Sequence, residues 1–121
     1  MATRAVGNDL AELPAARKWV ADFLSAQGIP TKLAQLAVVL ADELVANAIT
    51  HGAPPIEISL STTAGIVRCE VADGSNTIPA LNIADPTEIS GRGIQLVAKL
   101  ANRWGTSVAG PGKRVWFELD L

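Results

Sequence analysis

Residues 33–52 read LAQLAVVLADELVANAITHG, and this stretch decides the fold because it predicts one long apolar helix. Leucine recurs at helical spacing and forms one stripe, at Leu33, Leu36, Leu40 and Leu44. The helix has a second apolar flank, which consists of Val38, Val45 and Ile49. We therefore expect it to pack on more than one side. Thr31 is the expected N-cap, and Gly52 is expected to end the helix in the left-handed conformation.

Polar residues interrupt the leucine stripe in the second half of this helix. Glu43, Asn47 and His51 follow one another at about one residue per turn, close to the azimuth of the leucines. Polar groups on an apolar face are costly unless each finds a partner. The row is therefore a set of satisfied hydrogen bonds, an end turn that reaches solvent, or the floor of a cleft for a polar ligand or a metal. The helix alone favours the first two interpretations.

The composition predicts a single packed domain over residues 1–121. Of the 121 residues 49% are hydrophobic, which suffices for one core, and the one cysteine excludes an internal disulfide. The net charge of -2 gives no support for a nucleic-acid partner. We see no secretory signal, and the polar residues of the long helix make it a poor membrane span. We therefore expect a cytoplasmic protein with no membrane or nucleic-acid partner.

The rest of the chain alternates between helices and hairpins. Residues 3–7 give a weak signal for an edge strand, and a helix is expected to begin near residues 12–14. Alternating apolar and polar residues predict further strands at 56–60, 67–71, 104–108 and 115–121, and a third helix follows 91–93. This order predicts an α/β (α+β) two-layer sandwich, with four or five mostly antiparallel strands and three helices on one face. Cys69 is expected in the core. The outer sheet face is expected to be exposed or an interface, and its charged residues favour solvent, with Trp116 the exception.

Three separated features carry the potential chemistry. Glu43 and Asn47 are four residues apart and therefore adjacent on one helix face. Asp73-Gly74 follows a strand, where the carboxylate can accept from an amino group and the glycine lets a flat ring approach the backbone. Gly91-Arg92-Gly93 opens a helix, where free N–H groups, the helix dipole and the arginine suit phosphate oxygens. Taken alone, Asp-Gly is most often a turn, and glycines are common before helices.

Together, the order and spacing of these features resemble the histidine-kinase-like ATPase superfamily (GHKL, Bergerat fold). Residues 43–52 (ELVANAITHG) are similar to its N box, 71–75 (VADGS) to a shortened first glycine box, and 91–94 (GRGI) to its second glycine box. The segments 103–105 (RWG) and 112–117 (GKRVWF) resemble the small stand-alone members related to anti-sigma factor serine kinases. The resemblance covers nearly the whole chain.

The resemblance implies a role for each motif. Glu43 would be the catalytic base, Asn47 would ligate Mg²⁺ that bridges the ATP phosphates, and Asp73 would accept from the adenine 6-amino group. Residues 76–90 would form a lid. The other ATP-binding residues that the resemblance implies are His51, Gly74, Gly91, Arg92, Gly93 and Ile94. For His51, capping of the helix end and contact with the lid stay open, and for Lys113 and Arg114 we expect solvent rather than phosphate.

The expected function is an ATP-binding anti-sigma factor with protein-serine kinase activity. The resemblance implies that its substrate is an anti-sigma factor antagonist of the STAS type, and that its partners are this antagonist, a sigma factor and a second copy of the chain. Trp19 or Trp116 could serve an interface. The alternatives are a non-catalytic ATP-binding regulatory module and an interaction domain that no longer binds nucleotide.

Overall fold

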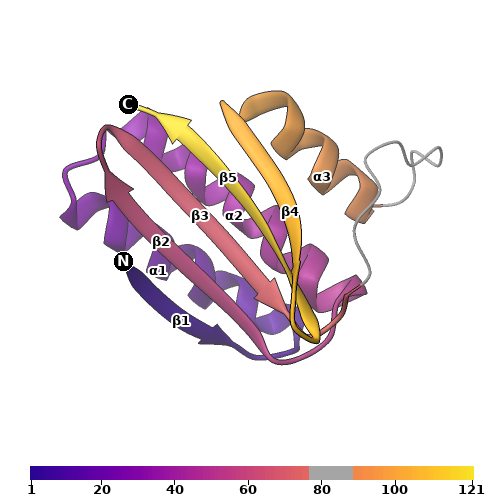
Figure 1. The fold of residues 1–121 in the computed structure, drawn as a ribbon. Coiled ribbons are helices and arrows are strands. Elements are labelled where there is room, and N and C mark those ends of the chain that lie inside the picture. The colour runs from indigo at the N-terminus through magenta and orange to yellow at the C-terminus, as the bar shows by residue number, and fades with distance from the viewer. Residues whose placement is uncertain (77–88) are drawn as a thin grey trace.

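Strands and helices form two layers in the computed structural model, which describes residues 1–76 and 89–121. The strands are β1 (Ala2–Val6), β2 (Ile56–Thr63), β3 (Ile66–Asp73), β4 (Arg103–Ala109) and β5 (Gly112–Asp120). The helices are α1 (Leu13–Ala26), α2 (Thr31–His51) and α3 (Ile89–Leu100), and a short 3-10 helix (Leu10–Glu12) precedes α1. All three lie on the same face of the sheet (Figure 1), which confirms the predicted sandwich.

The sheet has five strands in the order β1-β2-β3-β5-β4, and every neighbouring pair is antiparallel. The turn between β2 and β3 uses Ala64 and Gly65, whose φ angles of 54° and 75° are both positive. Two such residues give the turn a twist that matches the flanking strands. The long connection from β3 to β4 runs through α3, which places β5 between them. The end of β3 lies beside the start of β5, because the two strands are antiparallel.

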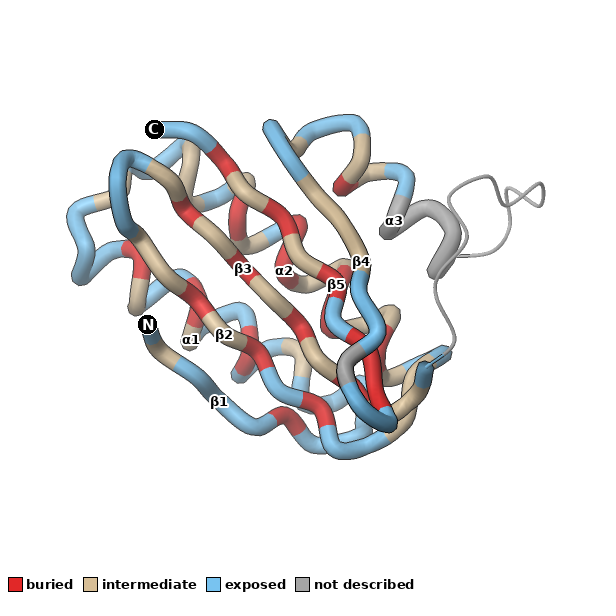
Figure 2. The backbone as a smooth tube through the Cα atoms, in the orientation of Figure 1, coloured by how far each residue is buried: buried red, intermediate tan, exposed pale blue. Residues whose placement is uncertain are grey.

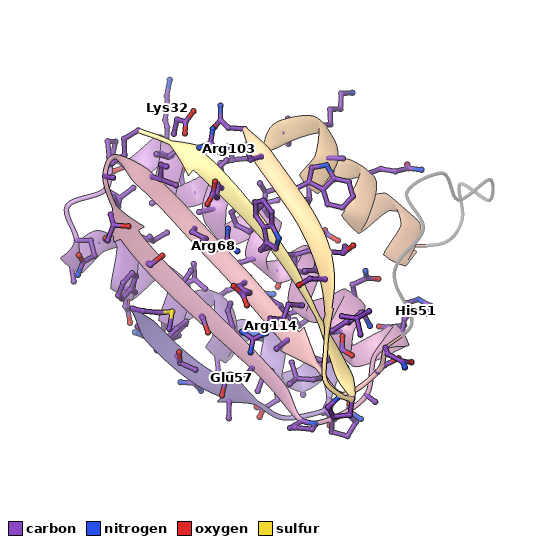
Figure 3. The ribbon with its side chains drawn as sticks, in the orientation of Figure 1. Lys32, His51, Glu57, Arg68, Arg103 and Arg114 are labelled. Atoms are coloured by element: carbon purple, nitrogen blue, oxygen red, sulfur yellow. The ribbon has the colours of Figure 1, made fainter. Side chains whose placement is uncertain are left out.

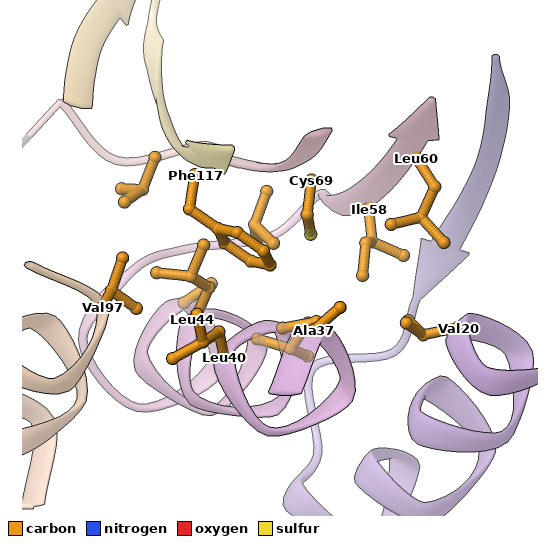
Figure 4. Close-up of a cluster of buried hydrophobic side chains, with 14 of the residues drawn as sticks. Val20, Ala37, Leu40, Leu44, Ile58, Leu60, Cys69, Val97 and Phe117 are labelled. Carbon is orange, nitrogen blue, oxygen red and sulfur yellow. The ribbon is translucent and has the colours of Figure 1, made fainter. Parts of the chain in front are cut away.

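The core lies between the sheet and α2. In β2, β3 and β5 one side of the strand is buried while the other is half-buried or exposed, so buried and less buried residues alternate along these strands (Figure 2). Figure 4 shows Leu40 and Leu44 of α2 beneath Phe117 of β5, with Val97 of α3 on one flank. Cys69 is fully buried, as predicted, and burial raises the pKa of its thiol. A core residue of this kind is a poor nucleophile.

Helix α2 is the central helix, with α1 and α3 on its two sides (Figure 1). By length and composition alone it is apolar enough to cross a membrane, a test that core helices also pass. Its buried residues face the core and are Ala37, Leu40, Ala41, Leu44, Val45 and Ala48. The predicted packing on more than one side is confirmed.

Three predicted helix ends were wrong in detail. Pro30 is the N-cap of α2 and Thr31 its first residue, and the cap makes no side-chain hydrogen bond. Gly52 is not left-handed, because its φ of -89° and ψ of -155° are extended and lead the chain directly toward β2. Helix α3 begins at Ile89, so Gly91-Arg92-Gly93 lies inside its first turns rather than before it. Glycine at these positions therefore does not mark a left-handed turn.

The outer face of the sheet carries a network of ion pairs, and Figure 3 shows Arg68, Arg103 and Arg114 on this side. The network joins Arg68 to Glu70 and Glu118, Arg103 to Glu118 and Asp120, and Arg114 to Glu70. Hydrogen bonds from Arg103 and Arg68 hold the pKa of the Glu118 carboxyl below its ordinary value. The Arg68 guanidinium also lies 4.3 Å from the ring centroid of Trp116. The side chains of this network are half-buried or exposed, and Trp116 is half-buried.

Candidate functional site

The polar row of α2 passes from the half-buried helix surface to solvent. Glu43 and Asn47 are both half-buried and lie one turn apart, whereas His51, the last residue of the helix, is exposed (Figure 3). The row is therefore not a set of satisfied buried hydrogen bonds throughout. An end turn in solvent describes His51 but does not describe Glu43 and Asn47.

Asn47 carries an orphaned polar atom. Among the described residues, its side-chain oxygen Oδ1 is the buried side-chain polar atom without a hydrogen-bond partner. A buried carbonyl oxygen without a partner costs free energy, and such groups are rare in native structures. An amide oxygen is also a suitable ligand for Mg²⁺, which in nucleotide sites takes few protein ligands and completes its shell with phosphate oxygens and water. The residue present therefore fits the metal that the resemblance implies.

Glu43 has an environment that favours its protonated form. Burial, and secondarily the nearby charge of Asp42, raises the pKa of the Glu43 carboxyl above its ordinary value. Asp42 itself is paired with Arg17 of α1, with Nη1 and Oδ1 3.0 Å apart. A carboxylate with a raised pKa is a stronger base than an ordinary one. Glu43 can therefore accept a proton from a hydroxyl group that comes within hydrogen-bond reach.

Asp73 at the end of β3 is buried and contacts a backbone N–H and a lysine. Its Oδ1 accepts a hydrogen bond from the Ser75 N–H at 2.8 Å. The ammonium of Lys113 donates to Oδ1 at 3.1 Å and forms an ion pair with the carboxylate, with Nζ 2.9 Å from Oδ2. The two side chains are 3% and 5% exposed, so this is a buried ion pair.

The expectation that Lys113 lies in solvent was wrong. Lys113 is the direct cross-strand partner of Asp73 in the register of β3 and β5. It also shares the inward side of β5 with Val115, Phe117 and Leu119, all of which are buried. The alternation along β5 was a signal that could have placed Lys113 inside. The expectation for Arg114 is confirmed, since its side chain is 52% exposed and pairs with Glu70 on the outer face.

Glycines from three elements enclose the Asp73 carboxyl and its backbone. A Cβ at Gly52 would lie 2.6 Å from Asp73 Cγ and 2.6 Å from the Ala48 carbonyl oxygen. A Cβ at Gly112 would meet the Asp73 carbonyl oxygen, and one at Gly74 would meet the Pro54 carbonyl oxygen. The Gly74 N–H donates to the Ala53 carbonyl oxygen at 2.6 Å. Close backbone approach is therefore what requires glycine here, including at Gly74.

Replacing Gly52 with alanine is expected to lower the free energy of unfolding by about 1–3 kcal/mol, the usual cost of an overpacked site. Backbone and a buried ion pair surround the added methyl group, so neither can move away cheaply. Chemical denaturation checks the value. The matched control is Thr50→Ala, because Thr50 is exposed on the same helix and its replacement should change stability by no more than about 0.5 kcal/mol. Equal stability of the two variants would contradict the tight fit at Gly52.

The second glycine motif lies close to the end of α2. Helix α3 packs beside α2, and Figure 1 shows α3 beginning on the side of the molecule where α2 ends. The backbone of Gly91, Arg92, Gly93 and Ile94 belongs to the first turns of α3. Their side chains lie outside the described residues, as do residues 77–88 of the lid predicted over 76–90. The structure thus brings the end of α2, the end of β3 and the start of α3 to one side of the fold.

Comparison with known proteins gives a family match that covers most of the chain. No curated protein sequence matches the chain. The histidine kinase-like ATPase domain, in contrast, matches residues 6–119, which include all of α1, α2, α3 and β2 to β4. The motifs on α2, β3 and α3 all fall inside this match. Because it spans nearly the whole sequence, the chain belongs to the histidine kinase-like ATPase domain family, and this membership supports ATP binding.

Proposed function

We propose that this protein is an ATP-dependent protein-serine kinase that binds a sigma factor and phosphorylates an anti-sigma factor antagonist of the STAS type. The observation that carries the kinase activity is the pair on α2: a buried amide oxygen without a partner, at Asn47, one turn from a carboxylate with a raised pKa, at Glu43. The likeness of residues 103–105 and 112–117 to anti-sigma factor serine kinases supports the proposed partners. A second copy of the chain as a further partner and a cytoplasmic location are part of the same proposal.

The proposed step transfers the γ-phosphoryl group of ATP to a serine hydroxyl. Asn47 would hold Mg²⁺ through Oδ1, and the ion would neutralise charge on the phosphates. Glu43 takes the proton of the serine hydroxyl as its oxygen forms the new bond to the γ-phosphorus. The bond between that phosphorus and the β,γ-bridging oxygen breaks, and ADP leaves with the electron pair. Asp73 binds the 6-amino group of adenine.

The proposal is tested by mixing the protein with Mg-ATP and a candidate antagonist and detecting phosphoserine by mass spectrometry. Transfer to one serine of the antagonist, in a manner that requires this protein, is the expected result. ATP binding without transfer to any antagonist would favour the alternative, in which the chain is a non-catalytic regulatory module. Failure of Mg-ATP at a hundred times its expected Kd to stabilise the fold by about 2.7 kcal/mol would contradict both.

The Asn47→Ala variant is expected to weaken ATP binding only when magnesium is present. The amide oxygen is the protein ligand in the proposal, and the loss of even outer partners of a metal site typically costs about tenfold or more in affinity. Calorimetric titrations with Mg²⁺ and with EDTA measure the two affinities. A similar loss of affinity under both conditions would show that Asn47 acts on the nucleotide or on the fold and not through the metal.

The Asp73→Asn variant is expected to weaken ATP binding by about 1.5–3 kcal/mol, the usual value of a hydrogen bond to a charged group. The measurement belongs well below the melting temperature of the variant, because the substitution also leaves Lys113 without its partner. Unchanged affinity in calorimetry would remove Asp73 from the adenine site.

A further inference from the structure

The ion pair between Asp73 and Lys113 has an unusual position for a charged pair. Both side chains are buried on the inward side of the sheet, at the end of β3 where the proposed adenine site lies. The other lysines of the chain are exposed, at Lys18, Lys32 and Lys99. Burying an ion pair costs desolvation free energy, and an apolar pair of similar volume would hold two strands together as well. Stability alone therefore does not account for a charged pair at this position.

The ion pair does not use all the hydrogen-bonding groups of Lys113 and Asp73. An ammonium group has three N–H donors, and Lys113 donates one hydrogen bond to Asp73, at Oδ1. Asp73 Oδ1 accepts from Lys113 and from the Ser75 N–H, whereas Oδ2 is the ion-pair contact of Lys113, 2.9 Å from Nζ. At least one N–H donor on Lys113 and an acceptor position on Oδ2 thus remain on neighbouring atoms of the pair.

This adjacent acceptor and donor match one edge of adenine. Adenine presents the 6-amino group, a donor, beside N1, an acceptor, whereas guanine presents an acceptor at O6 beside a donor at N1. We infer that Lys113 is a specificity-determining residue of the nucleotide site, and that it donates to adenine N1 while Asp73 Oδ2 accepts from the 6-amino group. The inference rests on the proposed ATP binding at Asp73. Guanine would place its O6 acceptor against the Asp73 carboxylate and its N1–H donor against the Lys113 ammonium. The same pair therefore rejects guanine.

The role of Lys113 can be tested with nucleotides that lack one ring nitrogen. In 1-deaza-ATP the N1 atom is replaced by C–H, which removes the acceptor and leaves the 6-amino group in place. We expect the wild-type protein to bind 1-deaza-ATP roughly tenfold or more weakly than ATP, the scale of a charged hydrogen bond. The analogue 7-deaza-ATP, which keeps N1, should bind like ATP. Calorimetry measures all three affinities.

Variants then separate Lys113 from other donors that could reach N1. In Lys113→Met the two affinities for ATP and 1-deaza-ATP should differ by no more than about twofold. The matched control is Arg114→Met, which removes the adjacent cation on the opposite, exposed face of β5 and should keep the tenfold difference. If Lys113→Met does not fold, ¹⁵N NMR of the Lys113 Nζ in the wild-type protein replaces it. That resonance should shift with ATP and not with 1-deaza-ATP.

The outcomes separate this inference from the proposed function. Equal binding of ATP and 1-deaza-ATP by the wild-type protein would overturn the contact to N1 while leaving ATP binding intact. A tenfold difference that persists in Lys113→Met, or an Nζ resonance that responds alike to both nucleotides, would assign the contact to another donor and overturn the role of Lys113. No binding of any of the three nucleotides would overturn the proposed function itself.

Discussion

Replacing Glu43 with glutamine is expected to slow phosphotransfer to the antagonist by a factor of roughly 100 to 10,000, the usual contribution of a general base. Glutamine keeps the size of the side chain but cannot accept the proton of the serine hydroxyl. ATP affinity should stay close to the wild-type value, because Glu43 acts on the attacking hydroxyl and not on the nucleotide. Single-turnover assays of phosphoserine formation, together with calorimetry, measure both quantities. Transfer at the wild-type rate would remove Glu43 from its assigned role.

The neighbour of Glu43 provides a sharper test of the same role. The charge of Asp42 contributes to the raised pKa of Glu43, so Asp42→Asn should lower that pKa. Glu43 would then stay ionised to lower pH, and the acidic limb of the pH–rate profile should move to lower pH. The variant also loses the pairing of Asp42 with Arg17, which is largely exposed and worth less than about 1 kcal/mol. An unmoved acidic limb would contradict Glu43 as the titrating base.

The raised pKa of Glu43 also links this residue to stability. The folded state binds the proton of Glu43 more tightly than the unfolded state does. The resulting stabilisation is fully present below the unfolded pKa and is lost as the pH rises through the folded pKa. At neutral pH the ionised carboxylate therefore destabilises the fold, so Glu43→Gln should melt at a higher temperature than the wild type. At a pH below the unfolded pKa this difference should vanish, which thermal denaturation at the two pH values measures.

The second large effect is expected on stability, from Lys113→Met. The substitution leaves the Asp73 carboxylate buried, with only the Ser75 N–H as its partner among the described residues. Removing one member of a buried ion pair typically costs about 3–5 kcal/mol, and we expect the free energy of unfolding to fall by that amount. Denaturation in urea measures it. The matched control is Arg114→Met, whose exposed pair with Glu70 should be worth less than about 1 kcal/mol.

A double variant shows whether the loss comes from the unpaired charge. In Asp73→Leu/Lys113→Met both charged groups are replaced by apolar ones, so no isolated charge remains in the protein. Its stability should lie well above that of Lys113→Met, because replacing a whole buried pair is often close to neutral. A double variant as unstable as the single one would attribute the loss to packing around the glycines rather than to the charge on Asp73.

Much of the fold could be predicted because it depends on local periodicity. The leucine stripe of residues 33–44 places α2 against the core, and the alternation in residues 66–73 and 112–120 gives β3 and β5 one buried side each. The helix ends were less predictable, since the reason for glycine at residue 52 lies in another element. Only the folded chain shows that the Asp73 carboxyl occupies the space where a Cβ would be.

In the candidate site, too, one part could be predicted from the sequence and another depends on the tertiary structure. Glu43 and Asn47 lie one turn apart on a single helix, so the sequence by itself determined that they share a face. The partner of Asp73 was decided only by the tertiary structure, because Lys113 is 40 residues away and meets it through the register of β3 and β5. Periodicity within a strand specifies which side a residue faces, but the register between distant strands follows from packing of the whole sheet on α2. That register turned a lysine expected in solvent into the buried partner of the proposed adenine-binding carboxylate.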